Sequence, residues 1–125
     1  MRYLKPKIKE TQVKKMIMEY LAILEKQKKI WCFRAGSGTI ETKQGNWFKT
    51  GKSGCPDIVC CLPKGKFLGL EAKSSVGGQQ SIAQKEAEGR IKMLGGEYHI
   101  VRSIEEVYKL LKSIKWQRIK LQQLF

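Results

Sequence analysis

The sequence is short of acidic residues and of long apolar runs, and each shortage excludes something. Asp and Glu number 11 against 25 Lys and Arg, which gives the 125-residue chain a formal charge of +14. So large a surplus indicates a polyanionic partner, nucleic acid first and an anionic membrane surface second. No apolar run approaches the ~18 residues of a membrane span, and the basic first residues are not followed by the apolar segment of a signal peptide. We therefore expect a cytoplasmic protein.

Histidine and zinc-type cysteine pairs are also scarce. The four cysteines are Cys32, Cys55, Cys60 and Cys61, without a CxxC pair, and His99 is the single histidine. This composition argues against a zinc site and favours buried, reduced thiols. Cys60 and Cys61 are adjacent in a strand pattern, so they should face opposite ways. A lone histidine in a strand is more often half-buried and structural than catalytic.

The hydrophobic pattern predicts one α/β domain over residues 1–125, with a central mixed sheet flanked by helices. Apolar periodicity and turn residues predict a helix from about residue 10, a strand at 30–35, a loop or short hairpin at 36–52, strands at 58–62 and 67–70, a helix from 81, a strand at 97–102 and a helix from 103. Residues 1–9 form a basic arm. Residues 115–125 form a basic and apolar tail, which either continues the last helix into the core or packs on a second subunit.

Local signals give the boundaries of the last two helices. Ser81 with Gln84, and Ser103 with Glu106, fit capping boxes. A left-handed cap at residues 95–96 should end the first of these helices. Its buried side should carry Ala83, Ala87, Ile91 and Leu94, and the last helix should turn Val107, Leu110, Leu111 and Ile114 inward.

Residues 54–73, GCPDIVCCLPKGKFLGLEAK, hold the charged residues that the strand pattern explains least well. They read as two short strands joined by a tight turn, with Asp57 opening the first and Glu71 and Lys73 on one face at the end of the second. Charged groups at the end of an apolar strand are costly unless they bind something. Two converging carboxylates suit Mg²⁺ or Mn²⁺. A lysine beside them can hold a water or stabilise charge on a phosphate.

With 13 residues between Asp57 and Glu71, these three side chains resemble the core motif of the PD-(D/E)xK nuclease superfamily. The segments GCPDIV, GKFLGLEAK and GGEYHIVRSIEEV, with a glutamine-bearing helix, look more narrowly like the virus-type replication-repair nuclease domain. The resemblance covers about residues 9–111. It implies a restriction-endonuclease-like core with its site at one edge of the sheet.

The resemblance also implies the roles of individual residues. Mg²⁺, for which Mn²⁺ substitutes, would be held by Asp57, Glu71, the backbone carbonyl of Ala72 and Glu10, while Lys73 steadies the attacking water or the developing charge. Glu10 has a second explanation, since an acidic side chain in the first turn of a helix also interacts favourably with the helix dipole. Glu19 is the fallback ligand. No organic cofactor is expected.

Two further assignments stay open between a functional and a structural reading. Gln84 would position the water or the scissile phosphate in the resembling family, but it also fits the capping box, and Gln79 and Gln80 are weaker candidates. In the 36–52 segment, Lys43, Lys49 and Lys52, with Arg34 before them, suit contacts with DNA phosphates. Alternatively, Trp47 and Phe48 cap the core while the lysines keep the loop soluble.

The resemblance implies a Mg²⁺-dependent, structure-selective DNA endonuclease. Small stand-alone phage and bacterial members look like resolvases of four-way (Holliday) junctions that act as homodimers, and we expect the same here. A flap or repair-intermediate nuclease is one alternative. A restriction-type enzyme is another, although 125 residues leave little room for base readout. A non-catalytic, basic DNA-binding module is the alternative of a different class.

Overall fold

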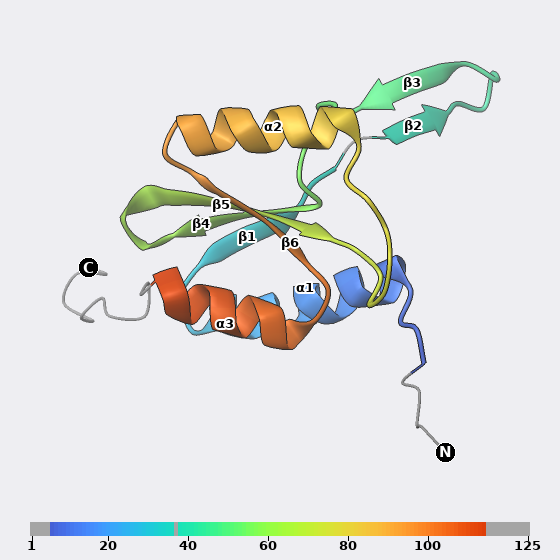
Figure 1. Ribbon diagram of the computed structural model, residues 1–125. Helices are drawn as coiled ribbons and strands as arrows, with labels where there is room; N and C mark the ends of the chain where they lie inside the picture. The colour runs from blue at the N-terminus through green and yellow to red at the C-terminus, as the bar shows by residue number, and fades with distance from the viewer. Residues whose placement is uncertain (1–5, 37, 115–125) are drawn as a thin grey trace.

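The computed structural model describes residues 6–36 and 38–114 (Figure 1). The elements in chain order are α1 Glu10–Lys26, β1 Trp31–Arg34, β2 Gly38–Glu41, β3 Trp47–Thr50, β4 Ile58–Leu62, a 3₁₀ turn at Pro63–Gly65, β5 Lys66–Ala72, α2 Ile82–Met93, β6 Glu97–Val101 and α3 Ile104–Ile114. The prediction of a mixed α/β fold with helices around a central sheet is confirmed. The tail at 115–125 and the first five residues of the basic arm lie outside the described residues.

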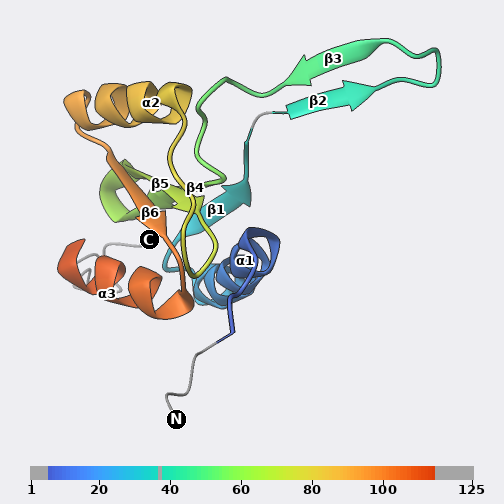
Figure 2. The ribbon, with the colours of Figure 1, turned by 45° about the vertical axis from the view of Figure 1, so that its right-hand side comes forward.

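The central sheet has four strands in the order β1-β4-β5-β6. The pairs β1–β4 and β4–β5 are antiparallel, whereas β5 and β6 are parallel, which makes the sheet mixed. β2 and β3 form a separate two-stranded hairpin that projects away from the body of the molecule (Figures 1 and 2). The hairpin is inserted between β1 and β4, so the chain leaves the central sheet and returns to it shortly before Asp57.

The helices form layers on the two faces of the sheet. α1 and α3 lie together on one face and α2 lies on the other (Figure 2). Alternating β5 residues Leu68, Leu70 and Ala72 are completely buried with the apolar stripes of α1 and α3. The α1 stripe is Val13, Ile17, Leu21 and Leu24, at the helical spacing that the sequence shows. Among the described residues, no helix is long and apolar enough to cross a bilayer.

The prediction that α2 carries a buried side is wrong in part. Ala83, Ala87 and Ile91 are only half-buried, and Leu94 is 76% exposed. α2 packs mainly over β6 at one edge of the sheet. At the opposite edge of the same face, the described residues leave Trp31 and Phe33 of β1 exposed.

The predicted ends of these helices are largely confirmed. Ser81 and Gln84 form a complete capping box. Gly95 has a φ of 94°, and the amides of Gly95 and Gly96 donate to the carbonyls of Lys92 and Ile91, which closes a left-handed cap. The second box forms only by half. The Ser103 hydroxyl accepts from the Glu106 amide, but the Glu106 carboxylate accepts from the amide of Arg102, one residue too early.

Candidate functional site

Asp57 lies where the hairpin's return segment enters β4, and close packing sets its position. Gly54 has a φ of 80°, and a Cβ there would lie 2.1 Å from the Ala83 carbonyl oxygen, so the loop is pressed against α2. Pro56 packs on Gly69 of β5, where a Cβ would come within 2.8 Å of the proline ring. Asp57 Oδ2 then accepts a 2.8 Å hydrogen bond from the amide of Ala72. The contact joins the start of β4 to the end of β5, as the strand pattern predicts.

Glu71 is the only charged side chain that is completely buried among the described residues. The hydroxyl of Tyr98 donates to Glu71 Oε1 over 2.9 Å, while Oε2 has no hydrogen-bond partner in the part of the chain that the structure describes. Burial raises the pKa of Glu71. The hydrogen bond from Tyr98 and the charge of Lys73 oppose that rise, whereas Asp57 and Glu10 add to it. A buried carboxylate oxygen without a partner is costly in free energy unless a ligand satisfies it.

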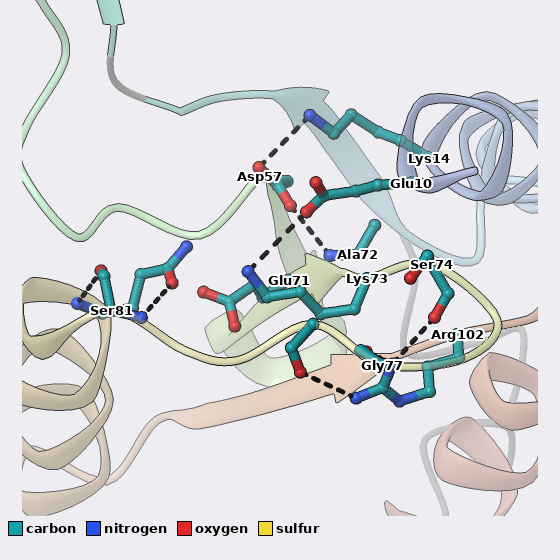
Figure 3. Close-up of polar contacts among 12 residues, drawn as sticks. Glu10, Lys14, Asp57, Glu71, Ala72, Lys73, Ser74, Gly77, Ser81 and Arg102 are labelled. Atoms are coloured by element: carbon teal, nitrogen blue, oxygen red, sulfur yellow. Dashed lines mark hydrogen bonds and ion pairs between the residues drawn. The ribbon is translucent and has the colours of Figure 1, made fainter.

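Lys73 and the first turns of α1 complete the cluster (Figure 3). Lys73 Nζ lies 3.8 Å from Glu10 Oε1, and its amide donates to the Val101 carbonyl, which holds the backbone after β5. One helical turn beyond Glu10, Lys14 Nζ lies 3.4 Å from Asp57 Oδ1. The predicted residues Glu10, Asp57, Glu71 and Lys73 therefore meet at one end of the central strands β4 and β5.

The donors suit Mg²⁺ better than a metal that needs a full protein cage. Among the described residues, no three His, Cys, Asp or Glu side chains are already grouped as a metal site. Mg²⁺ keeps several waters and is often bound by one or two carboxylates. Glu71 Oε2 is unpartnered within the described ranges, and Asp57 lies next to it in the cluster. The side chain of Glu10 is about half exposed (48%), which leaves it room to turn toward a metal.

The predicted carbonyl ligand is not tested by these contacts. Ala72 is completely buried at the end of β5, and the atom through which it meets Asp57 is its amide nitrogen. Coordination by the Ala72 carbonyl therefore stays a prediction. Glu19 is exposed farther along α1, and nothing in the structure favours it over Glu10.

The structure bears on one of the two explanations of Gln84. Gln84 uses its Oε1 to accept from the Ser81 amide at 2.8 Å, so its capping role is confirmed and its catalytic role stays a prediction. Gln80, a weaker candidate from sequence, is a neighbour of Tyr98, the residue that donates to Glu71. Its Nε2 donates to Glu88 Oε1 at 3.0 Å, and its side chain also lies against the hydroxyl of Tyr98.

Three polar residues at the site were missed in the sequence. Lys14 follows Glu10 by four positions, and that spacing on one helix face is the signal that could have found it. The only sequence signal for Tyr98 is its place in an apolar strand, because a buried phenol needs a hydrogen-bond partner. Arg102 donates to the carbonyls of Ser74, at 2.8 Å, and of Gly77, and so braces the loop that follows Lys73.

The structure also places the described end of the N-terminal arm, the adjacent cysteines and the single histidine. The amide of Ile8 donates to Ser75 Oγ at 2.8 Å, and the Ser75 amide returns a bond to the Ile8 carbonyl, so residues next to α1 dock beside the site. Cys60 is buried and Cys61 is exposed, so the two face opposite ways, as predicted. The prediction of buried thiols is met by Cys60 alone, because Cys32 and Cys55 are half-buried and Cys61 lies on the surface. His99 is half-buried with Nε2 2.9 Å from Glu97 Oε1, in keeping with a structural role.

The residues predicted to contact DNA are all on the surface, and Arg34 pairs with Ile58, the residue that follows Asp57. Arg34 ends β1, Lys49 lies on β3, and Lys43 and Lys52 lie in the turn and the return segment of the hairpin; all four are exposed. The alternative that Trp47 and Phe48 cap the core is wrong, because they are 65% and 57% exposed on the projecting hairpin.

Comparison with known proteins leaves the site to be interpreted from its own chemistry. No protein-family model, no curated protein and no solved structure matches the chain.

Proposed function

We propose that the protein is a metal-dependent DNA endonuclease with a PD-(D/E)xK-type site. The buried carboxylate of Glu71, with one oxygen unpartnered among the described residues and Asp57 and Lys73 beside it, carries this proposal. The order of the elements around Asp57 and Glu71, a helix, antiparallel strands, a helix and a parallel strand, agrees with such a core.

In this proposal Asp57 and Glu71 hold Mg²⁺ or Mn²⁺, with Glu10 contributing directly or through a water. The bound metal supplies Lewis-acid activation of the phosphate and a water of lowered pKa. Asp57 is kept in place by the Ala72 amide and Glu71 by the Tyr98 hydroxyl, so both ligands are oriented before the metal arrives. Lys73, held next to Glu10, places a positive charge where the attacking water or the phosphate oxygens gain negative charge.

The charge of the chain supports DNA as the substrate. A formal charge of +14 attracts the phosphate backbone without sequence preference. Contacts with phosphates position a protein on DNA without reading its sequence, which favours selection by DNA structure. Among branched substrates we favour the four-way junction cut by a homodimer, because two coordinated nicks require two active sites.

The test is cleavage of end-labelled four-way junction, 5′ flap and linear duplex of related sequence, in Mg²⁺, Mn²⁺ and EDTA. Glu71→Gln and Glu10→Gln are compared with Glu19→Gln, which tests the fallback ligand on the exposed part of α1. We expect paired, symmetric nicks in the junction that disappear in EDTA. Cleavage should fall about 100-fold or more in Glu71→Gln and remain at wild-type level in Glu19→Gln.

Each alternative gives a different pattern of products. Cleavage of the flap in preference to the junction would favour the repair-intermediate nuclease, and cleavage of linear duplex at a fixed sequence would favour a restriction-type enzyme. DNA that is bound but uncut in both metals would contradict the nuclease and leave the non-catalytic binding module. Sedimentation of the wild-type protein with and without junction DNA tests the homodimer.

A further inference from the structure

The β2–β3 hairpin exposes apolar side chains that the fold does not use. Ile40, Trp47 and Phe48 are 56%, 65% and 57% exposed, and none belongs to the buried core. A two-stranded ribbon without a covering layer is only marginally stable in water. Large apolar groups gathered on such a ribbon indicate a surface that meets a partner.

The register of the hairpin places these groups on both of its faces. Ile40 lies directly opposite Phe48, so the two share one face, while Trp47 lies opposite Glu41 on the other. A partner that covered one side would leave the remaining aromatic group in water. An element with apolar groups on both faces is suited to enter a gap between two flat apolar surfaces.

Charge on the same segment selects the class of partner. Residues 38–52 contain three lysines, Lys43, Lys49 and Lys52, against the single acid Glu41. A hollow of about 220 Å³ at the base of the hairpin is lined by Lys49 with Gly38, Thr39, Thr50, Gly51 and Ser53. Lysines among exposed aromatic groups are typical of a surface that holds a nucleic-acid backbone while bases stack on the rings. Base pairs that face each other across an interrupted stack are also flat surfaces between which a two-faced ribbon fits.

The base of the hairpin adjoins the candidate site. The amide of Ala35 donates to the Asp57 carbonyl over 2.7 Å, which joins the outgoing and returning chains at that point. On the return, Gly54 is held against Ala83 of α2, which limits how far the base can shift. DNA with a phosphate at Asp57 and Glu71 would therefore present neighbouring nucleotides to the hairpin, which extends outward from the end of the sheet where β1 ends and β4 begins (Figures 1 and 2).

We propose that the β2–β3 hairpin is a wedge that enters branched DNA where base stacking is interrupted. Trp47 stacks on a base on one face, the Ile40–Phe48 pair contacts a base on the other, and Lys43 and Lys49 hold the flanking phosphates. A continuous duplex offers no such gap, so the hairpin selects branched over linear DNA. This inference rests on the proposed function for the nature of the substrate, and it names the element that recognises it.

The test is performed in EDTA, so that cleavage plays no part. Affinities for a synthetic four-way junction and for a linear duplex of matched length are measured by fluorescence anisotropy. Trp47→Ala and Phe48→Ala should each weaken junction binding about tenfold and duplex binding less than about twofold, because a stacked base is lost only at the branch. Lys49→Ala should weaken both alike, and Met93→Ala, an exposed apolar residue at the far end of α2, should change neither.

A second measurement uses the wild-type protein, so that it does not depend on the folding of a variant. A junction carrying 5-iododeoxyuridine at the branch point is irradiated in the complex, and the crosslinked peptide is identified by mass spectrometry. The wedge predicts a crosslink to Trp47 or Phe48 that is absent with the same base in the duplex. A crosslink that maps outside residues 38–52 would overturn it.

The other outcomes also have defined meanings. Equal loss of junction and duplex binding in Trp47→Ala, or unchanged binding with an altered sedimentation coefficient, overturns the wedge; the latter assigns the hairpin to contact with a second copy. If the crosslink and the junction preference are found but neither Mg²⁺ nor Mn²⁺ supports cleavage, the wedge stands and the nuclease fails. If cleavage is found and the hairpin variants retain full preference for the junction, the nuclease stands and the wedge fails.

Discussion

Tyr98 donates a hydrogen bond from its hydroxyl to Oε1 of Glu71 over 2.9 Å, between the parallel strands β5 and β6. Both side chains are completely buried. The bond occupies one oxygen of the carboxylate and so directs the other, Oε2, to any ligand that enters. Burial raises the pKa of the Tyr98 phenol, and its bond to Glu71 raises it further, so Tyr98 stays a donor throughout the neutral range.

Replacing Tyr98 with Phe should therefore weaken both the fold and metal binding. Loss of the buried bond should lower the free energy of unfolding by about 1–3 kcal/mol. Affinity for Mn²⁺, measured by calorimetry, should fall about tenfold or more, because Glu71 loses the group that orients it. Tyr108→Phe, on the exposed side of α3, is the control and should change neither quantity. Wild-type Mn²⁺ affinity in Tyr98→Phe would show that the phenol does not position the ligand.

Glu71→Gln should stabilise the metal-free protein at neutral pH, because it removes a buried carboxylate whose pKa is raised by burial. The folded state binds a proton on Glu71 more readily than the unfolded state does. Stability from this group is therefore present at acid pH and is lost as the pH rises from the ordinary glutamate range through the raised pKa. Urea unfolding in EDTA across that range should show a flatter pH dependence in Glu71→Gln than in wild type.

The matched control for that series is Glu86→Gln on the exposed side of α2, which should leave the pH profile as it is. A Glu71→Gln protein that is less stable than wild type at neutral pH would mean that the carboxylate is already satisfied in the metal-free fold.

Lys14→Gln should strengthen metal binding. Lys14 Nζ lies 3.4 Å from Asp57 Oδ1, where its positive charge opposes a cation. Removing that charge should raise Mn²⁺ affinity about fivefold at low salt, less at high salt, and should change stability by no more than about 1 kcal/mol. Lys15→Gln, its exposed neighbour, serves as the control. Weaker Mn²⁺ binding in Lys14→Gln would instead make the lysine a support for Asp57.

Gly54→Ala should damage the site through its backbone. The new Cβ would lie 2.1 Å from the Ala83 carbonyl oxygen at a φ of 80°. We expect a loss of about 2–4 kcal/mol in the free energy of unfolding, with weakened Mn²⁺ binding because Asp57 shifts. Gly45→Ala is the matched control, since Gly45 has a φ of 83° but no atom within 4 Å of a Cβ. Comparable losses in both variants would attribute the effect to φ alone and not to the contact with α2.

The elements could be predicted where the pattern is local. The three- and four-residue spacing from Val13 to Leu24 placed α1 correctly, and Ser81 with Gln84 formed the predicted cap. The buried side expected for α2 was wrong at Leu94, because the pattern shows which side of a helix is apolar but not how far the sheet beneath it extends. Trp47 was ambiguous for a related reason, since hydrophobicity alone does not distinguish a core from an exposed surface.

The proximity of Asp57 and Glu71 can be predicted from the sequence around them. Two apolar strands joined by a tight turn can pair in only a few registers, and this one places the start of β4 beside the end of β5. Tyr98 and Lys14 reach the same carboxylates from elements far away in sequence. Their contacts depend on parallel pairing of β6 with β5 and on the docking of α1 under the sheet, and both arise from packing of the whole core. Residue spacing thus predicts that Asp57 and Glu71 lie together. Tyr98, which orients Glu71, and Lys14, whose charge opposes a cation at Asp57, reach them only when the distant segments pack.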